Sequence, residues 1–222
     1  MITALLNKLC LALAIVCCMQ VPNDPPAISD YDILDFKAFN GIRFQYCLLL
    51  PEMYQRDASY EIVAVLTEVH RKDKAWEKSM EQLVAIDLQN TILIVPQVPV
   101  GEESWGTHPI HHAFNDLLKE VRKSYGQPKQ KFHLVGLEAG HETAFWWTFG
   151  SANLIASTSI IKGHLWKEDR WDEKWYKNLM GSNVPIIAYE ERLSSKFDMS
   201  KITLKEMTSI AQVLADIEQR GQ

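Results

Sequence analysis

The sequence predicts an α/β protein with a mostly parallel sheet and helices on both faces. Short, β-branched apolar runs at 60–66 and 91–96 are typical of strands that are buried on both faces. Amphipathic stretches that fit helices lie between such runs, and this alternation favours a parallel sheet. The chain has 222 residues, 47% of them hydrophobic, which suffices for one sizeable core.

The first half of the chain contains three expected strands and two expected helices. The first strand lies in FNGIRFQYCLLLPEMY (39–54), where apolar residues alternate on one face and Pro51 ends the run. The other two are the runs at 60–66 and 91–96. A helical stripe between these two runs comprises Trp76, Met80, Leu83 and Val84. A second stripe follows Thr107 and Pro109, which suit a helix start, and comprises Ile110, Phe114, Leu117, Leu118 and Val121.

The second half continues the alternation. We expect strands at 131–137, 153–160 and 184–190, and a helix at 139–149. The polar, tryptophan-rich stretch 162–180 lies where a surface excursion between two strands would lie. Thr203 and Glu206 form a capping box, which predicts that the last helix begins there.

The N-terminus has the pattern of a secretory signal peptide over residues 1–18. Lys8 precedes an apolar run from Leu9 to Val16, which is short for a membrane helix. Lipidation of Cys17 or Cys18 is one alternative, and a disordered N-terminus is another. We therefore expect an exported protein (periplasmic, secreted or lipid-anchored) with a linker at 19–34 and a single domain at 35–222.

Removal of residues 1–18 would leave Cys47 as the only cysteine, so no internal disulfide is expected. Cys47 itself suits a small buried hydrophobe.

The charge pattern excludes some partners. The formal net charge is −5, and basic residues are interspersed with acids, so no nucleic-acid surface is expected. Outside the N-terminus, no stretch is long and apolar enough to span a bilayer, so membrane contact is expected only through an N-terminal lipid anchor. We expect no cofactor.

The run LVGLEAGHE (134–142) contains the most informative motif. Gly136, Ala139 and Gly140 surround Glu138 at the spacing of a sharp strand-to-helix turn that normally presents a serine. We expect these small residues to let the helix pack against the strand and to let the turn take a positive φ.

Several stretches carry a family resemblance: NGIRFQYCLLLPEMY, YEIVAVL, LLKEVRKSYG and FHLVGLEAGHETAFWW. Together they resemble the α/β-hydrolase superfamily, and within it the secreted esterase and polyhydroxybutyrate-depolymerase-like group. The likeness runs from about residue 35 to 219, and it implies an α/β-hydrolase-like sheet. The turn around Glu138 and the helix before its strand are the specific part.

The resemblance implies a nucleophile, an oxyanion loop, an acid and a late histidine. The first three fall at Glu138, at Thr67 and Glu68, and at Glu190 or Glu191. The late histidine has no match, because the last histidine of the chain is His164.

The altered positions lead to the main functional hypothesis. The carboxylate of Glu138 could attack an ester, but hydrolysis of the product needs a base to activate water. Carboxylates at Glu68 and Glu138 would also repel a developing oxyanion. The sequence therefore predicts a non-catalytic pseudo-esterase that binds an unknown ligand or protein partner. The alternatives are an active carboxylic-ester hydrolase with an atypical base, His141 or His70, and an exported scaffold or surface lipoprotein without a small ligand.

Other polar and aromatic groups have two interpretations each. Trp105, Trp147 and Trp166 could line an aromatic ligand groove, or they could pack in the core. His108, His111 and His112 could bind a metal, but exposed neutral imidazoles near a helix start are favoured. Glu138, His141 and Glu142 lack a metal-ligand spacing, so no metal site is expected. Ser157 and Ser159 are interpreted as structural, because nothing in the sequence suggests a base beside them.

Overall fold

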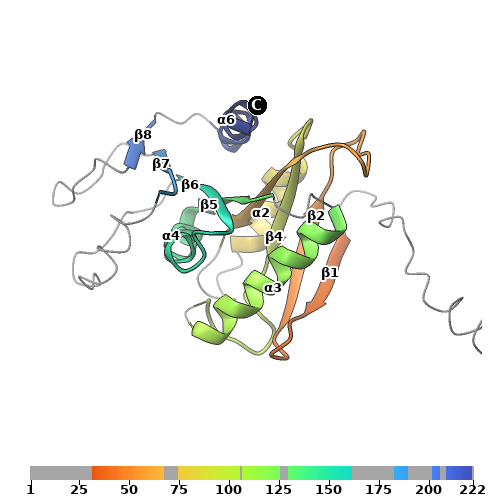
Figure 1. The fold of residues 1–222 in the computed structure, drawn as a ribbon, viewed down its shortest axis with the longest axis vertical. Helices are drawn as coiled ribbons and strands as arrows, with labels where there is room; N and C mark the ends of the chain where they lie inside the picture. Colours follow the sequence, from red (N-terminus) through yellow and green to blue (C-terminus); the bar gives the residue numbers. More distant parts are fainter. Residues whose placement is uncertain are drawn as a thin grey trace, which may run out of the picture.

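The structure is a computed structural model, and it describes residues 32–67, 75–105, 107–125, 130–161, 183–189, 202–205 and 209–221. Within these ranges the chain forms an eight-stranded sheet with the strand order β1-β2-β4-β3-β5-β6-β7-β8 (Figure 1). The first two strands form an antiparallel hairpin, β1 (Asp32–Lys37) with β2 (Arg43–Leu49), and β2 is also antiparallel to β4.

The remaining strands run parallel to one another. They are β3 (Glu61–Leu66), β4 (Thr91–Pro96), β5 (Phe132–Leu137), β6 (Ile155–Ile161), β7 (Ile186–Tyr189) and β8 (Ile202–Leu204). Residues of β4 and β5 are buried on both faces, as their uninterrupted apolar runs require. The predicted α/β class with a mostly parallel sheet is confirmed.

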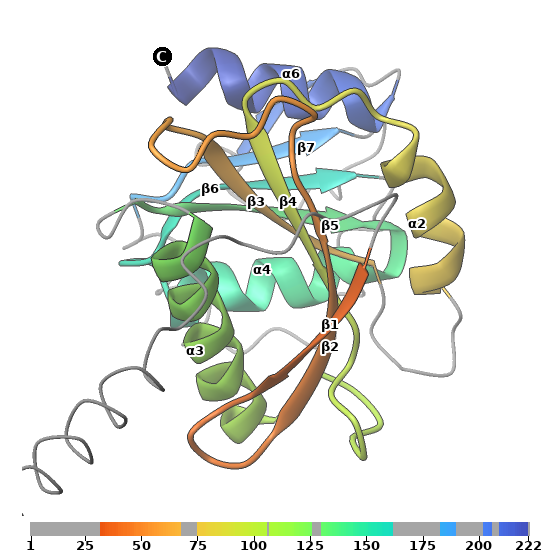
Figure 2. The same ribbon diagram turned by 90° about the vertical axis from the view of Figure 1, so that its right-hand side faces the viewer.

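Helices cover both faces of the sheet (Figure 2). On one face, α3 (His108–Tyr125) and α4 (His141–Gly150) pack on a core that includes Phe114 and Trp147. On the other face, α2 (Ala75–Val84) and α6 (Ile210–Gly221) pack on a core that includes Trp76 and Leu214. Both predicted helical stripes are confirmed, since their residues lie in or against these two cores.

Three predicted boundaries are wrong. β1 begins at Asp32, inside the stretch assigned to the linker at 19–34. Thr203 lies in β8, where it pairs with Ile187, so the sheet ladder overrides the capping signal. The last helix accordingly begins at Ile210. The helix expected from 139 instead begins with a short 3-10 turn, Glu138–Gly140, and continues as α4.

Cys47 is fully buried, as expected for a small hydrophobe. In the described ranges, no helix combines the length and the apolar character that a bilayer crossing needs. The signal peptide and the excursion at 162–180 lie outside the described residues, so they remain predictions.

Candidate functional site

The turn after β5 holds Glu138 in a strained backbone conformation. Its φ is 51°, and it is the only non-glycine residue with a positive φ in the part of the chain that the structure describes. A residue with a side chain adopts this region only at a cost, and such residues concentrate at functional sites. The turn therefore keeps the geometry that presents a side chain at the carboxyl end of the sheet.

The two glycines of the motif serve close packing. A Cβ on Gly136 would lie 2.5 Å from the Cα of His141. A Cβ on Gly140 would lie 2.6 Å from the amide nitrogen of Thr67 and even closer to the carbonyl group of Leu66. Gly140 itself has a φ of −70°. The expected turn with a positive φ is present, and Glu138 rather than a glycine adopts it.

The Glu138 carboxylate faces a cation. Lys78 of α2 places its Nζ 3.7 Å from Glu138 Oε1, and the two side chains are 67% and 37% exposed. A pair this open to water contributes little stability, so both groups remain accessible to a ligand. No sequence pattern pointed to Lys78, because a single lysine on a helix surface is ordinary.

His141 contacts the backbone of the turn. Its Nδ1 lies 2.5 Å from the carbonyl oxygen of Glu138. A carbonyl oxygen only accepts, so Nδ1 carries the hydrogen and Nε2 is the basic nitrogen. This contact fixes the turn and does not involve the Glu138 carboxylate.

Thr67 lies at the end of β3, beside Gly140, and is almost fully buried. Among the described residues, its hydroxyl has no hydrogen-bond partner. The rest of the predicted oxyanion loop and acid strand lies outside the described residues, namely Glu68, His70, Glu190 and Glu191. Their assigned roles remain predictions.

The predicted aromatic groove is wrong for the two tryptophans that can be placed. Trp105 and Trp147 are each 4% exposed, and their ring centroids lie 5.0 Å apart. Trp147 also stacks on Phe114. Both therefore pack in the core, as the alternative interpretation held, while Trp166 lies outside the described residues.

The histidines near the start of α3 form no metal site. His108 and His112 are exposed, whereas His111 is half-buried and contacts Ser151 Oγ at 2.8 Å. Burial, followed by the neighbouring His112 and His108, lowers the pKa of His111. Within the described ranges, no group of three potential ligands is arranged to hold a metal ion.

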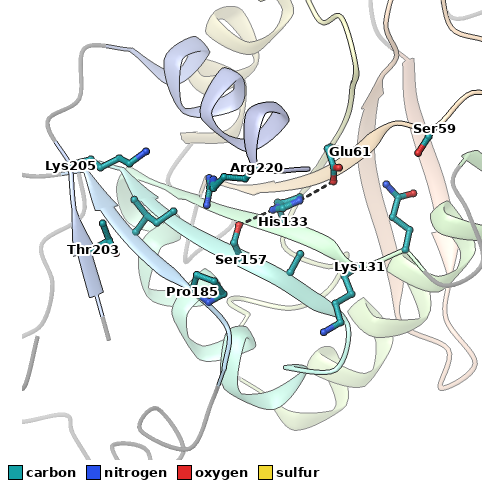
Figure 3. Close-up of a pocket in the computed structure, with 12 residues that line it drawn as sticks. Ser59, Glu61, Lys131, His133, Ser157, Pro185, Thr203, Lys205 and Arg220 are labelled. Atoms are coloured by element: carbon teal, nitrogen blue, oxygen red, sulfur yellow. Dashed lines mark hydrogen bonds and ion pairs between the residues drawn. The ribbon is translucent and has the colours of Figure 1, made fainter. Parts of the chain in front are cut away.

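A second constellation lies at the opposite edge of the sheet. A cleft of about 780 Å³ opens at the amino ends of the parallel strands (Figure 3). The cleft is lined by Glu61 of β3, His133 of β5 and Ser157 of β6, and each is among the first three residues of its strand. Lys131 and Arg220 also line this cleft.

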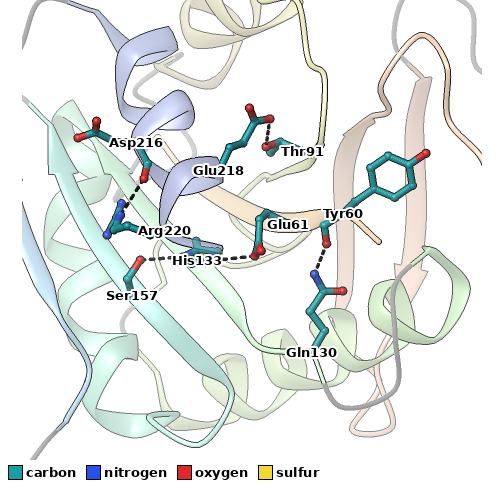
Figure 4. Close-up of polar contacts among 9 residues, drawn as sticks. All are labelled: Tyr60, Glu61, Thr91, Gln130, His133, Ser157, Asp216, Glu218 and Arg220. Atoms are coloured by element: carbon teal, nitrogen blue, oxygen red, sulfur yellow. Dashed lines mark hydrogen bonds and ion pairs between the residues drawn. The ribbon is translucent and has the colours of Figure 1, made fainter. Parts of the chain in front are cut away.

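The three residues form a hydrogen-bonded chain (Figure 4). His133 Nδ1 lies 2.7 Å from Ser157 Oγ, and His133 Nε2 lies 2.9 Å from Glu61 Oε2. The interpretation of Ser157 as a serine without a base is therefore wrong. His133 and Ser157 are register partners in the β5–β6 pair. In the sequence, the available signal for this site was a polar residue near the start of each apolar strand. Only the strand register shows that these residues contact one another.

Comparisons with known proteins support the fold. No protein-family model matches the chain, and no curated protein matches it in sequence. A thermostable esterase structure is similar with a TM-score of 0.55 at 15% identity, over 81% of this chain and 54% of that chain. This chain therefore spans about half the length of that esterase.

Two further structures match over most of their length. One is XC6422 from Xanthomonas campestris, described as an α/β serine hydrolase without a lid, with a TM-score of 0.52 at 15% identity. That match covers 89% of this chain and 94% of the other. The second is a thioesterase domain from the curacin biosynthetic pathway, with a TM-score of 0.53 at 11% identity, over 84% and 98% of the two chains.

These neighbours contradict the expectation of a non-catalytic pseudo-esterase, because they are named as an esterase, a serine hydrolase and a thioesterase. Because the identities are 15% or lower, the similarity to these structures establishes the fold alone. The eight-stranded, mostly parallel sheet with helices on both faces agrees with it. The chain has an α/β-hydrolase-like fold.

Proposed function

We propose that this protein is a carboxylic-ester hydrolase in which Glu138 acts as the general base. The observation that carries the proposal is the positive φ of Glu138, which is maintained at a turn where glycines allow two strands and a helix to meet closely. The carboxylate is partly exposed and lies at the carboxyl end of the parallel strands, the edge where open α/β sheets bind ligands.

General-base catalysis avoids the difficulty of direct attack. If the Glu138 carboxylate attacked the ester, a mixed anhydride would form, and its hydrolysis would still need an activated water. In the proposed reaction, a water attacks the ester carbonyl while Glu138 accepts its proton. The Lys78 ammonium group stabilises the oxyanion, and Glu138 then returns the proton to the departing alcohol. The 3.7 Å distance between Lys78 Nζ and Glu138 Oε1 supports this proposal, because it is short enough for both groups to contact one ester group.

The test is hydrolysis of 4-nitrophenyl butyrate, with a 3-hydroxybutyrate ester added because the resemblance favours the polyhydroxybutyrate-depolymerase-like group. An acyl thioester serves as a third substrate. We expect Glu138→Gln to lower kcat/KM for 4-nitrophenyl butyrate at least about 100-fold, because the amide cannot accept the proton. Lys78→Met should lower kcat more than it changes KM, because the cation acts on charge that develops in the transition state.

Glu142→Gln is the matched control, since it makes the same substitution one turn along, in α4. It should retain the wild-type rate. Wild-type protein with no turnover above buffer would overturn the proposal, and so would a Glu138→Gln variant as fast as the wild type.

We also propose that the protein is exported, on the pattern of residues 1–18. Expression in a Gram-negative host followed by N-terminal sequencing should show cleavage near Cys17. Incorporation of radiolabelled palmitate that disappears when both Cys17 and Cys18 are replaced by alanine would identify a lipoprotein. An intact N-terminus in the cytoplasmic fraction would contradict export.

A further inference from the structure

We propose that the cleft at the amino ends of the strands is a second acyl-transfer site, in which Ser157 is the nucleophile for esters that carry a negative charge. This site shares no residue with the turn at Glu138, so it stands or falls independently of the reaction proposed there. Ser157, His133 and Glu61 are the residues that carry it.

The direction of the hydrogen bonds suits a nucleophile and its base. The Glu61 carboxylate only accepts, so His133 Nε2 carries the imidazole hydrogen and donates it across 2.9 Å. His133 Nδ1 is then the unprotonated nitrogen, and it accepts a hydrogen from Ser157 Oγ across 2.7 Å. Glu61 thereby holds the imidazole in the tautomer that can remove the proton of Ser157.

The sheet holds this arrangement rigidly. Ser157 is 3% exposed and His133 is 6% exposed, and the two lie side by side in the register of β5 and β6. The register shifts between Phe132 and His133, which is the kind of irregularity that re-aims a side chain. Side chains held by strands rather than loops are positioned accurately, as a nucleophile and its base require.

The reaction balances with water as the only co-reactant. The Oγ of Ser157 bonds to the carbonyl carbon of the ester while its proton passes to His133 Nδ1. His133 gives that proton to the departing alcohol, which leaves an acyl group on Ser157. Water then attacks this acyl ester, His133 accepts its proton, and Ser157 recovers the proton as the carboxylic acid leaves.

The charges around the cleft indicate the substrate class. Three cationic side chains line the cleft, those of Lys131, Lys205 and Arg220. Among the described lining residues, Glu61 supplies the one carboxylate. Asp216 partly offsets the cations, because its carboxylate pairs with Lys205 and its carbonyl accepts from Arg220. The excess of positive charge favours an ester whose acyl or alcohol part carries a carboxylate or phosphate.

A fluorophosphonate probe tests the nucleophile, because it reacts covalently with an activated serine and not with a carboxylate. We expect the intact mass of the full-length protein to increase by one adduct, and peptide mapping to place the adduct on Ser157. Ser157→Ala should abolish labelling, and His133→Gln should slow it at least about 100-fold. Glu61→Gln should slow it less and make it more dependent on pH, because Glu61 positions the imidazole.

Two variants serve as controls. Ser59→Ala removes a serine that lines the same cleft but lies outside the hydrogen-bonded chain, so labelling should persist. Glu138→Gln should label like the wild type, even if it hydrolyses 4-nitrophenyl butyrate slowly. Together, the labelling and hydrolysis results distinguish a failure of the proposal for Ser157 from a failure of the proposal for Glu138.

The substrate class is tested with 4-nitrophenyl hemisuccinate, which is anionic, against neutral 4-nitrophenyl butyrate in the Glu138→Gln background. We expect the anionic ester to be hydrolysed faster, and Lys131→Gln to reduce this preference about two- to fivefold at low salt. Wild-type protein that the probe leaves unlabelled, or labels elsewhere than on Ser157, overturns the proposed nucleophile. An equal or reversed preference between the two esters overturns the substrate class.

Discussion

Gly140 is where the turn at Glu138 meets the neighbouring strand, and Gly140→Ala tests how strictly that contact is required. The added Cβ would lie 2.6 Å from the amide nitrogen of Thr67 and closer still to the carbonyl group of Leu66. All three atoms belong to the backbone, so no rotamer change relieves the overlap. The end of β3 or the start of α4 has to move by about 1.5 Å or more to restore ordinary contact.

The expected magnitude follows from two opposing effects. Gly140 has a φ of −70°, which alanine adopts readily, so the substitution alone would stabilise the fold by about 0.4–1 kcal/mol. Overpacking of a rigid site costs about 1–3 kcal/mol and occasionally more. Because the clash involves backbone on both sides, we expect the free energy of unfolding to fall by about 2–3 kcal/mol.

Urea unfolding followed by tryptophan fluorescence measures this change. Gly41→Ala is the control, since its Cβ would have no atom within 4 Å but its φ of 87° is unfavourable for alanine. That variant should lose about 1 kcal/mol from backbone strain alone. A Gly140→Ala variant as stable as the Gly41→Ala variant, or more stable, would refute the packing argument.

Three further predictions concern stability and titration. Trp76→Phe removes the 2.9 Å hydrogen bond from the indole nitrogen to the buried carbonyl of Val95, so the unfolding free energy in urea should fall by about 1–3 kcal/mol. Burial, followed by a hydrogen bond to Asp216, raises the pKa of Tyr189 to about 12, so stability should decrease between pH 10 and 12 as the unfolded chain loses its proton first. Absorbance at 295 nm measures this ionisation. The hydrogen bond from Lys205 is the largest cause that lowers the pKa of Asp216, so Lys205→Gln should raise that pKa in an NMR titration. In the wild type, the stability that the ionised Asp216 carboxylate contributes should therefore be lost only as the pH falls below the ordinary carboxyl range.

The fold was predictable because its main signals are local. Apolar runs such as 91–96 and the helical stripes have the periodicity of their elements, whatever they pack against. The last helix was misplaced at Thr203 because the structure there depends on a tertiary contact and not on a local signal. Three residues of β8 form a strand because β7 lies alongside, and a local capping pattern contains no information about that neighbour.

The candidate sites were predictable only in part, for a similar reason. The turn at Glu138 has a contiguous motif, so its position was found from the sequence. His133 lies 24 residues from Ser157 and 72 from Glu61, and only the strand register brings them together. The inference of an inactive protein rested on three altered features, namely the glutamate at the nucleophile position, the carboxylates near the expected oxyanion site and the missing late histidine. None of these features contains information about the register that joins His133 to Ser157.

Strand β5 separates the two proposed centres along its own length. His133 lies near its start and Glu138 directly follows its end, so five residues of extended chain hold them about 16 Å apart. Mixed-substrate kinetics should therefore be additive, and an inhibitor that saturates one centre should leave the rate at the other unchanged. Two reactions on one chain would then be distinguishable by inhibition patterns alone.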